Sequence, residues 1–156
     1  MINLIKISNA IKMIRMIESR WSKWSISYIV FFKRISIFSD DVTLVICPGI
    51  CNSSESVYIR RTTYQAQLTG FRVAVLNHIG ALKKLQITSP RIFNYGNTGD
   101  YHLMVMDILK RFPNTKIVCV GFSMGANLVT KYLGETDRPE QILAGISVCQ
   151  GYDAKE

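Results

Sequence analysis

The stretch KIVCVGFSMGANLVTKYLG, residues 116–134, decides the fold of this chain. Its first five residues form an apolar run rich in β-branched side chains, which predicts a buried strand. Met124 begins a helical segment that Gly134 ends. Between strand and helix, GFSMG matches the pattern G-x-S-x-G, in which a serine lies on a sharp turn. The stretch therefore predicts a nucleophilic serine at Ser123.

The residue types of GFSMG suit the strained backbone that such a turn requires. A strained Ser123 points its hydroxyl out from the carboxyl edge of the sheet. Gly121 and Gly125 leave the space that larger side chains would block. The alternative for Ser123 is an ordinary turn serine in a nucleotide-binding α/β domain, but no G-x-G-x-x-G follows any expected strand.

Two backbone N–H groups are expected to hold the oxyanion that forms when a serine attacks an ester. The N–H of Met124 lies at the start of the helix, beside the serine hydroxyl. The second donor is expected from the loop CPGICN, residues 47–52, in which Gly49 allows a sharp turn. Ile50 is the first choice for this donor and Cys51 is the second.

From Asp40 onward, apolar strands alternate with amphipathic helices. Further strands are expected at residues 43–47, 72–77 and 142–149, and further helices at residues 57–68 and 98–112. Strands with continuous apolar sequence are typically parallel and covered by helices on both faces of the sheet. The loop over residues 78–96 is long for a compact domain, so we expect it to be functional or to cover another part of the chain.

Polar residues are expected to cap these helices. Asn52, Ser53 and Ser54 offer caps for the helix that begins near residue 57, and Thr98 offers one for the next helix. Asn52 to Ser54 also fits the glycosylation acceptor pattern, but the position before a helix makes capping the better explanation.

Basic residues are concentrated at the N-terminal end. Residues 1–39 hold seven Lys and Arg residues against Glu18 alone, which places +6 of the total formal charge of +8 in this segment. Such a charge would suit nucleic acid, but the segment has no recognition motif and no aromatic platform apart from Trp21 and Trp24. No nucleic-acid partner is therefore expected.

The structure of residues 1–39 stays open between three interpretations: a disordered segment, an interfacial amphipathic helix over residues 2–17, or a misassigned start. The apolar run over residues 25–38 is interrupted by Lys33 and Arg34. It therefore lacks the ~18 uninterrupted apolar residues of a spanning helix and predicts one or two strands instead. No clear transmembrane helix or signal peptide is present.

Several motifs together resemble a known family. They are VICPGICNSSE, AVLNHIGAL, TSPRIF, VCVGFSMGAN, KYLGE and SVCQGYDA. Through them, residues 40–152 resemble the abhydrolase domain-containing protein 2 family of monoacylglycerol lipases, within the α/β-hydrolase superfamily. The resemblance leaves out residues 1–39. It implies a truncated α/β-hydrolase fold, with a mostly parallel sheet, in which residues 40–156 form the N-terminal two thirds of the domain.

The same resemblance implies a serine hydrolase of lipid esters such as acylglycerols, which acts through an acyl-enzyme at Ser123 and is associated with a membrane. No cofactor and no metal are expected, because the histidines lack the spacing of zinc ligands. The four cysteines form no C-x-x-C pair and are expected to be reduced thiols, buried where they lie in strands.

A serine nucleophile needs a histidine base and a carboxylate, which follow the serine in the chain order of this fold. His78 and His102 both precede Ser123, so the expected acid and base are not present in this chain. Asp153 and Asp137 are weaker candidates for the acid. We expect the full-length form to be the enzyme and this chain alone to be inactive. The alternative is a non-catalytic lipid- or membrane-associated α/β-hydrolase remnant.

Overall fold

The computed structural model describes residues 14–22, 25–32, 41–83, 87, 90–135 and 137–151. Six strands form one sheet in the order β1-β2-β4-β3-β5-β6. The strands are β1 Ile14–Ser22, β2 Ser25–Phe32, β3 Val42–Cys47, β4 Arg72–Asn77, β5 Lys116–Phe122 and β6 Ile142–Val148. The helices are α2 Val57–Leu68, α3 Gly99–Arg111 and α4 Met124–Gly134.

The strands β4, β3, β5 and β6 run parallel, as their continuous apolar sequences predict. In the centre of the sheet, Val45 pairs with Ala74 on one side and with Cys119 on the other. Strand β6 lies at the edge of the sheet, and its Leu143 and Ile146 are exposed. The parallel order brings the carboxyl ends of these strands to one edge, where the chain enters the loops that follow β3, β4 and β5.

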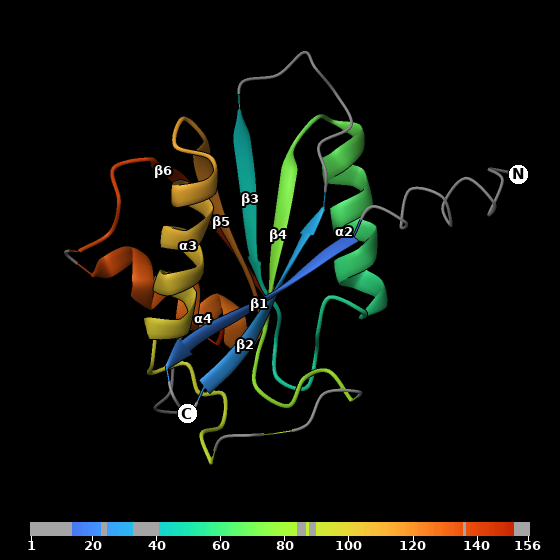
Figure 1. The fold of residues 1–156 in the computed structure, drawn as a ribbon, viewed down its shortest axis with the longest axis vertical. Coiled ribbons are helices and arrows are strands. Elements are labelled where there is room, and N and C mark those ends of the chain that lie inside the picture. Colours follow the sequence, from blue (N-terminus) through green and yellow to red (C-terminus); the bar gives the residue numbers. More distant parts are fainter. Residues whose placement is uncertain are drawn as a thin grey trace, which may run out of the picture.

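Helices cover both faces of the sheet (Figure 1), which confirms the fold class. Helix α2 packs on one face through a core formed by Ile46, Ile59, Ala66, Val73, Val75 and Val120. On the other face, α3 and α4 pack through a larger core that includes Val45, Ala74, Tyr101, Met104, Val105, Ile108, Cys119, Leu128, Val129 and Tyr132. Burial of these apolar side chains holds the strands in register, at roughly 1.5–3 kcal/mol for each large one.

Strands β1 and β2 pair antiparallel, and β2 pairs antiparallel with β4. The strand expected in residues 25–38 is thus confirmed over residues 25–32. The interfacial helix was expected over residues 2–17, and residues 2–13 of that range lie outside the described residues. From Ile14 onward it is wrong, because that backbone pairs with β2 instead. The division of the chain at residue 39 into two segments remains a prediction.

The caps expected for α2 are wrong in detail. Its N-cap position is Ser56, and the Ser56 side chain makes no capping bond to the helix. Instead, the Ser56 hydroxyl accepts a hydrogen bond from the Ser53 N–H and donates one to Asn52 Oδ1. The Ser54 N–H donates to Asn77 Oδ1 at 2.8 Å, which ties the turn to the end of β4. These side chains therefore shape the turn before the helix.

Thr98 occupies the N-cap position of α3, as expected, but its side chain does not cap the helix. Its hydroxyl lies 2.8 Å from both carboxylate oxygens of Glu135 and donates to them. This bond joins the start of α3 to the residue that follows α4, and a hydrogen bond to a carboxylate is stronger than one between neutral groups.

Arg72 joins the amino ends of β3, β4 and β5, at the edge of the sheet opposite the carboxyl ends of these strands. Its Nη1 lies 2.6 Å from Asp41 Oδ1 and 3.1 Å from Thr43 Oγ1. Its guanidinium carbon lies 3.7 Å from the ring centroid of Phe112. The Arg72 side chain is 15% exposed, so its charge is largely shielded from water and depends on these partners.

Replacing Arg72 by methionine is expected to lower the free energy of unfolding by about 2–3 kcal/mol, because the largely buried guanidinium gives up its hydrogen bonds to Asp41, Thr43 and Thr115 together. The matched control is Arg111→Met. Arg111 Nε also lies 2.6 Å from a carboxylate oxygen, that of Asp107, but its side chain is 39% exposed. The control should lose about 0.5 kcal/mol or less. Equal losses in urea unfolding would contradict this account of Arg72.

Candidate active site

Ser123 lies on a sharp turn between β5 and α4. Its backbone has φ 51° and ψ −125°, a conformation that residues other than glycine rarely adopt. The residue is exposed. Its N–H donates to the Val148 carbonyl at 2.9 Å, and its own carbonyl accepts from the Ala126 N–H at 2.9 Å. The turn is thus held from β6 on one side and from α4 on the other.

Two glycines allow the turn to pack against its surroundings. A Cβ added to Gly121 would lie 2.5 Å from the Ala126 Cα. A Cβ added to Gly125 would lie 2.3 Å from the Cys47 carbonyl oxygen and 2.5 Å from that of Pro48. These atoms belong to the backbone and cannot rotate away. The first turn of α4 therefore rests directly on the loop that follows β3.

The loop that follows β3 lies beside the side chain of Ser123. A Cβ added to Gly49 would lie 3.0 Å from the Ser123 Cβ and 3.6 Å from its Oγ. Larger side chains at Gly49 would thus crowd the hydroxyl. The structure brings together the G-x-S-x-G turn and the CPGICN loop, which the sequence separates by some seventy residues.

A tight turn at residues 49–52 sets the direction of the backbone N–H groups in this loop. The Asn52 N–H donates to the Gly49 carbonyl at 3.2 Å, and Asn52 Nδ2 donates to the Ile50 carbonyl at 2.8 Å. Cys51 has φ 58°. Within the described part of the chain, the N–H groups of Ile50 and Cys51 bind no acceptor. The N–H of Met124 is the first of α4 and has no partner in its own helix. Their role as oxyanion donors remains a prediction.

His78 lies directly after β4 and is buried at the same edge of the sheet. Its Nε2 lies 3.2 Å from the Pro48 carbonyl oxygen, and its ring stacks on Phe93 at 3.5 Å between centroids. Because a carbonyl only accepts, Nε2 carries the proton. Burial lowers the pKa of His78 to about 4, so the ring is neutral near pH 7. His78 is the first residue of the long loop over residues 78–96, and its bond to Pro48 ties that loop to the loop after β3.

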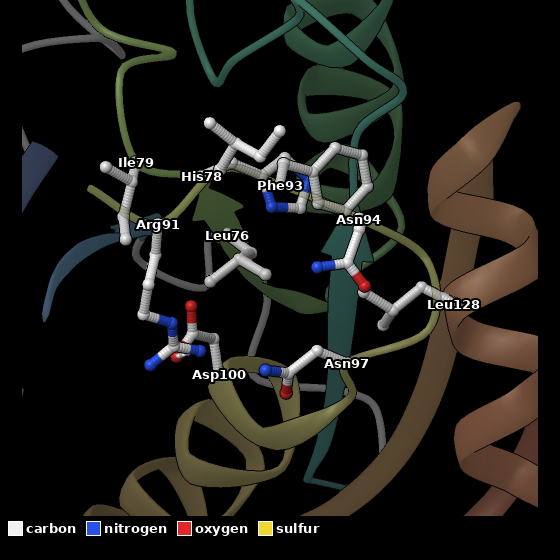
Figure 2. Close-up of a pocket in the computed structure, with 10 residues that line it drawn as sticks. Leu76, His78, Ile79, Arg91, Phe93, Asn94, Asn97, Asp100 and Leu128 are labelled. Carbon is white, nitrogen blue, oxygen red and sulfur yellow. Dashed lines mark ion pairs between the residues drawn. The ribbon is translucent and has the colours of Figure 1, made fainter. Parts of the chain in front are cut away.

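A small pocket lies against the loop over residues 78–96 (Figure 2). Residues of β4, α3, α4 and the loop over residues 78–96 line it. Arg91 Nη2 lies 3.8 Å from Asp100 Oδ1 there. The amide side chains of Asn94 and Asn97 also line the pocket, beside apolar side chains such as Leu76 and Leu128, so its lining is mixed.

Neither histidine provides the base for Ser123 among the described residues. His78 bonds to Pro48, and His102 Nδ1 lies 3.2 Å from the Tyr132 hydroxyl. Asp137 is an exposed residue after α4. Asp153 lies outside the described residues. None of the described residues is therefore assigned as the acid or the base of a catalytic triad.

The prediction for one of the four cysteines is wrong. The structure has four free thiols: Cys47 and Cys119 are buried, whereas Cys51 and Cys149 are exposed. Cys149 was expected to be buried in the last strand, but β6 ends at Val148 and lies at the sheet edge. Burial raises the pKa of the Cys119 thiol to about 11.

The described residues contain no cluster of three or more His, Cys, Asp or Glu side chains that could hold a metal ion. Among the helices that the structure describes, none is long and apolar enough to cross a membrane.

Tyr58 is the residue of the site that the sequence analysis missed. It lies in the first turn of α2, its hydroxyl accepts from the Gly49 N–H at 3.4 Å, and its ring meets Phe122 edge-on at 5.1 Å. The signal in the sequence is weak. An aromatic residue shortly after the CPGICN loop is close enough along the chain to fold back onto that loop.

The low pKa of His78 predicts an acid-dependent loss of stability. The unfolded chain takes up the proton near pH 6.5 and the folded chain only near pH 4, so protons favour the unfolded state between these values. The free energy of unfolding should fall by roughly 3 kcal/mol as the pH drops from 6.5 to 4. Asp100 opposes the shift, and Arg91 lines the same pocket. A His78→Phe variant should lose most of this slope in urea unfolding; an unchanged slope would contradict the assignment.

The geometry can be compared with known proteins. Residues 42–155 match the family described as alpha/beta hydrolase fold. Abhydrolase domain-containing protein 2 of Drosophila melanogaster is 56% identical over 119 residues, which are 75% of this chain and 30% of that protein. Monoacylglycerol lipase ABHD2 of Homo sapiens is 55% identical over 116 residues, which are 74% of this chain and 27% of that protein. This chain thus spans less than a third of the length of these curated relatives.

Solved structures agree on the fold. The esterase Pf2001 of Pyrococcus furiosus superposes with a TM-score of 0.70 at 18% identity and covers 88% of this chain and 51% of that one. An alpha-beta serine hydrolase homologue from Coxiella burnetii gives 0.63 at 16% identity and covers 80% and 58%. At such low identity these likenesses concern the fold alone.

Proposed function

This chain belongs to the alpha/beta hydrolase fold family, and from that premise we propose that it carries the nucleophile of a serine hydrolase acting on lipid esters of the acylglycerol type. The observation that carries the proposal is the strained Ser123 at φ 51°, whose hydroxyl lies beside Gly49 of the loop after β3. Relatives that are 52–56% identical include proteins named monoacylglycerol lipase, which supports the substrate class.

In the proposed reaction, Ser123 Oγ attacks the ester carbonyl and its proton passes to a histidine base. The oxyanion of the tetrahedral intermediate accepts hydrogen bonds from the N–H groups of Met124 and Ile50, with Cys51 as the alternative second donor. The intermediate collapses to an acyl-enzyme and the alcohol leaves with the proton. Water then attacks the acyl group and releases the fatty acid, which restores Ser123.

The histidine base and its carboxylate are proposed to come from outside the matched region. That region is only 27–30% of the length of the relatives, so most of a relative's chain has no counterpart in it. Residues 42–151 would then provide the nucleophile and the oxyanion donors, and the remainder of a complete hydrolase would provide the activating groups. Association with a membrane is part of the same proposal, because acylglycerols reside there.

The second candidate is a non-catalytic, lipid-associated form of the fold. The observation that favours it is that His78 and His102 are both committed to other partners than Ser123. In this case the 156-residue chain would keep the turn at Ser123 but would not turn over an ester.

A hybrid protein tests the proposal. In this hybrid, residues 42–151 replace the matching segment of the human monoacylglycerol lipase ABHD2, which provides the rest of the domain. We expect the hybrid to hydrolyse a monoacylglycerol, with release of fatty acid as the measurement. A folded hybrid that binds the lipid and releases no fatty acid would contradict the proposal and favour the non-catalytic form.

A further inference from the structure

One peptide unit beside Ser123 is held at both ends by side chains from other elements. The unit joins Pro48 to Gly49. Its carbonyl accepts from His78 Nε2 at 3.2 Å, and its N–H donates to the Tyr58 hydroxyl at 3.4 Å. In a trans peptide the C=O and N–H point in opposite directions, so the two side chains hold the unit from opposite sides. Such a pair restricts rotation of this peptide plane.

The held peptide comes immediately before the proposed oxyanion donors. The next peptide unit contains the Ile50 N–H, and its Gly49 carbonyl accepts from the Asn52 N–H at 3.2 Å. Rotation of the Pro48–Gly49 plane would therefore turn the Ile50 N–H as well. A donor must lie at a fixed place relative to the attacked carbonyl, and small misplacement costs much of its effect.

Both holding side chains are themselves fixed by aromatic packing. The ring of His78 stacks on Phe93, with an angle of 20° between the planes. The ring of Tyr58 packs edge-on against Phe122, the residue directly before Ser123. Figure 2 shows the His78 and Phe93 rings lying against each other. The side chain in each of the two hydrogen bonds, His78 as donor and Tyr58 as acceptor, thus has little freedom to move.

We propose that His78 and Tyr58 are positioning residues that orient the Pro48–Gly49 peptide, and through it the oxyanion donors of the loop after β3. The inference rests on the proposed function of Ser123. Neither residue touches the reacting atoms, and their effect is exerted through the backbone.

Three variants remove or restore the two hydrogen bonds with little change in shape. Tyr58→Phe removes only the hydroxyl, and His78→Phe keeps a ring for stacking on Phe93. His78→Gln brings back an N–H donor at a similar reach. His102→Phe is the control, because His102 bonds to Tyr132 and does not contact the loop.

The first measurement uses the 156-residue chain and does not depend on activity. Exchange of the Asn52 amide proton, followed by NMR, should become about 10-fold faster in Tyr58→Phe and His78→Phe, as expected for loss of one hydrogen bond. His78→Gln should restore the original rate, and His102→Phe should keep it. Unchanged exchange in both loop variants would overturn the inference. Equally faster exchange throughout β3, β4 and β5 would also overturn it, because it would reveal general loosening.

The second measurement uses the hybrid. Tyr58→Phe and His78→Phe should each lower kcat for monoacylglycerol about 10- to 100-fold while KM changes less than about 2-fold, because the donors act in the transition state. An equal rise in KM with unchanged kcat would overturn the positioning role. A parent hybrid without activity would count against the proposed function alone, since the exchange result still decides the inference.

Discussion

Replacing Ser123 by alanine is expected to lower kcat of the hybrid for monoacylglycerol by about 10⁴- to 10⁶-fold. The hydroxyl is the only group of the protein that forms a covalent bond to the substrate in the proposal, so its removal ends the acyl-enzyme route. The side chain is exposed and small, and the free energy of unfolding should change by less than about 1 kcal/mol. The measurement is release of fatty acid together with urea unfolding of both proteins.

A serine close to this position serves as the control. Ser147 lies on β6 opposite Gly121 and hydrogen-bonds Gln150. Ser147→Ala should keep kcat within about 3-fold of the parent, because this hydroxyl has no part in the proposed reaction. Activity of Ser123→Ala within 10-fold of the parent would contradict the role of Ser123.

Replacing Gly125 by alanine is expected to lower the free energy of unfolding by more than about 4 kcal/mol, or to prevent folding. The added Cβ would lie 2.3 Å from the Cys47 carbonyl oxygen and 2.9 Å from its carbonyl carbon. Because these atoms belong to β3 in the centre of the sheet, relief requires α4 to move away. Such a movement would also separate Ser123 from the loop after β3.

Gly134 in the same helix provides the matched control. An added Cβ there meets no described atom within 4 Å. Gly134→Ala should leave stability unchanged or raise it by up to about 1 kcal/mol, because alanine favours a helix more than glycine does. The comparison is made by urea unfolding at a fixed pH. Similar losses for the two variants would show that contact with Cys47 does not limit the packing of α4.

The periodic parts of the fold could be predicted because their signal is local. The runs at residues 72–77 and 116–120 have no polar side chain at interior positions, and this pattern occurs in strands buried on both faces. The buried side of α3 follows from Tyr101, Met104, Val105 and Ile108, which recur at the helical period. The G-x-S-x-G turn adds a backbone requirement that few residue types meet.

Partners of individual polar side chains could not be predicted, because they depend on contacts between distant segments. The Thr98 hydroxyl binds Glu135 instead of capping α3, and nothing in the sequence around residue 98 indicates an acceptor from α4. His78 could be placed after a strand, but its bond to Pro48 requires the parallel pairing of β3 with β4. Tyr58 is only nine residues from Gly49 in the chain, but no pattern in the sequence indicates that its hydroxyl turns back to that N–H.

The most direct test of the account is the site of covalent capture by a fluorophosphonate, which phosphonylates an activated serine. The hybrid would be inactivated with the probe, digested and examined by mass spectrometry. The account predicts one adduct, on Ser123, whose extent of formation follows the loss of monoacylglycerol hydrolysis. Loss of activity with Ser123 unmodified and another residue phosphonylated would contradict it.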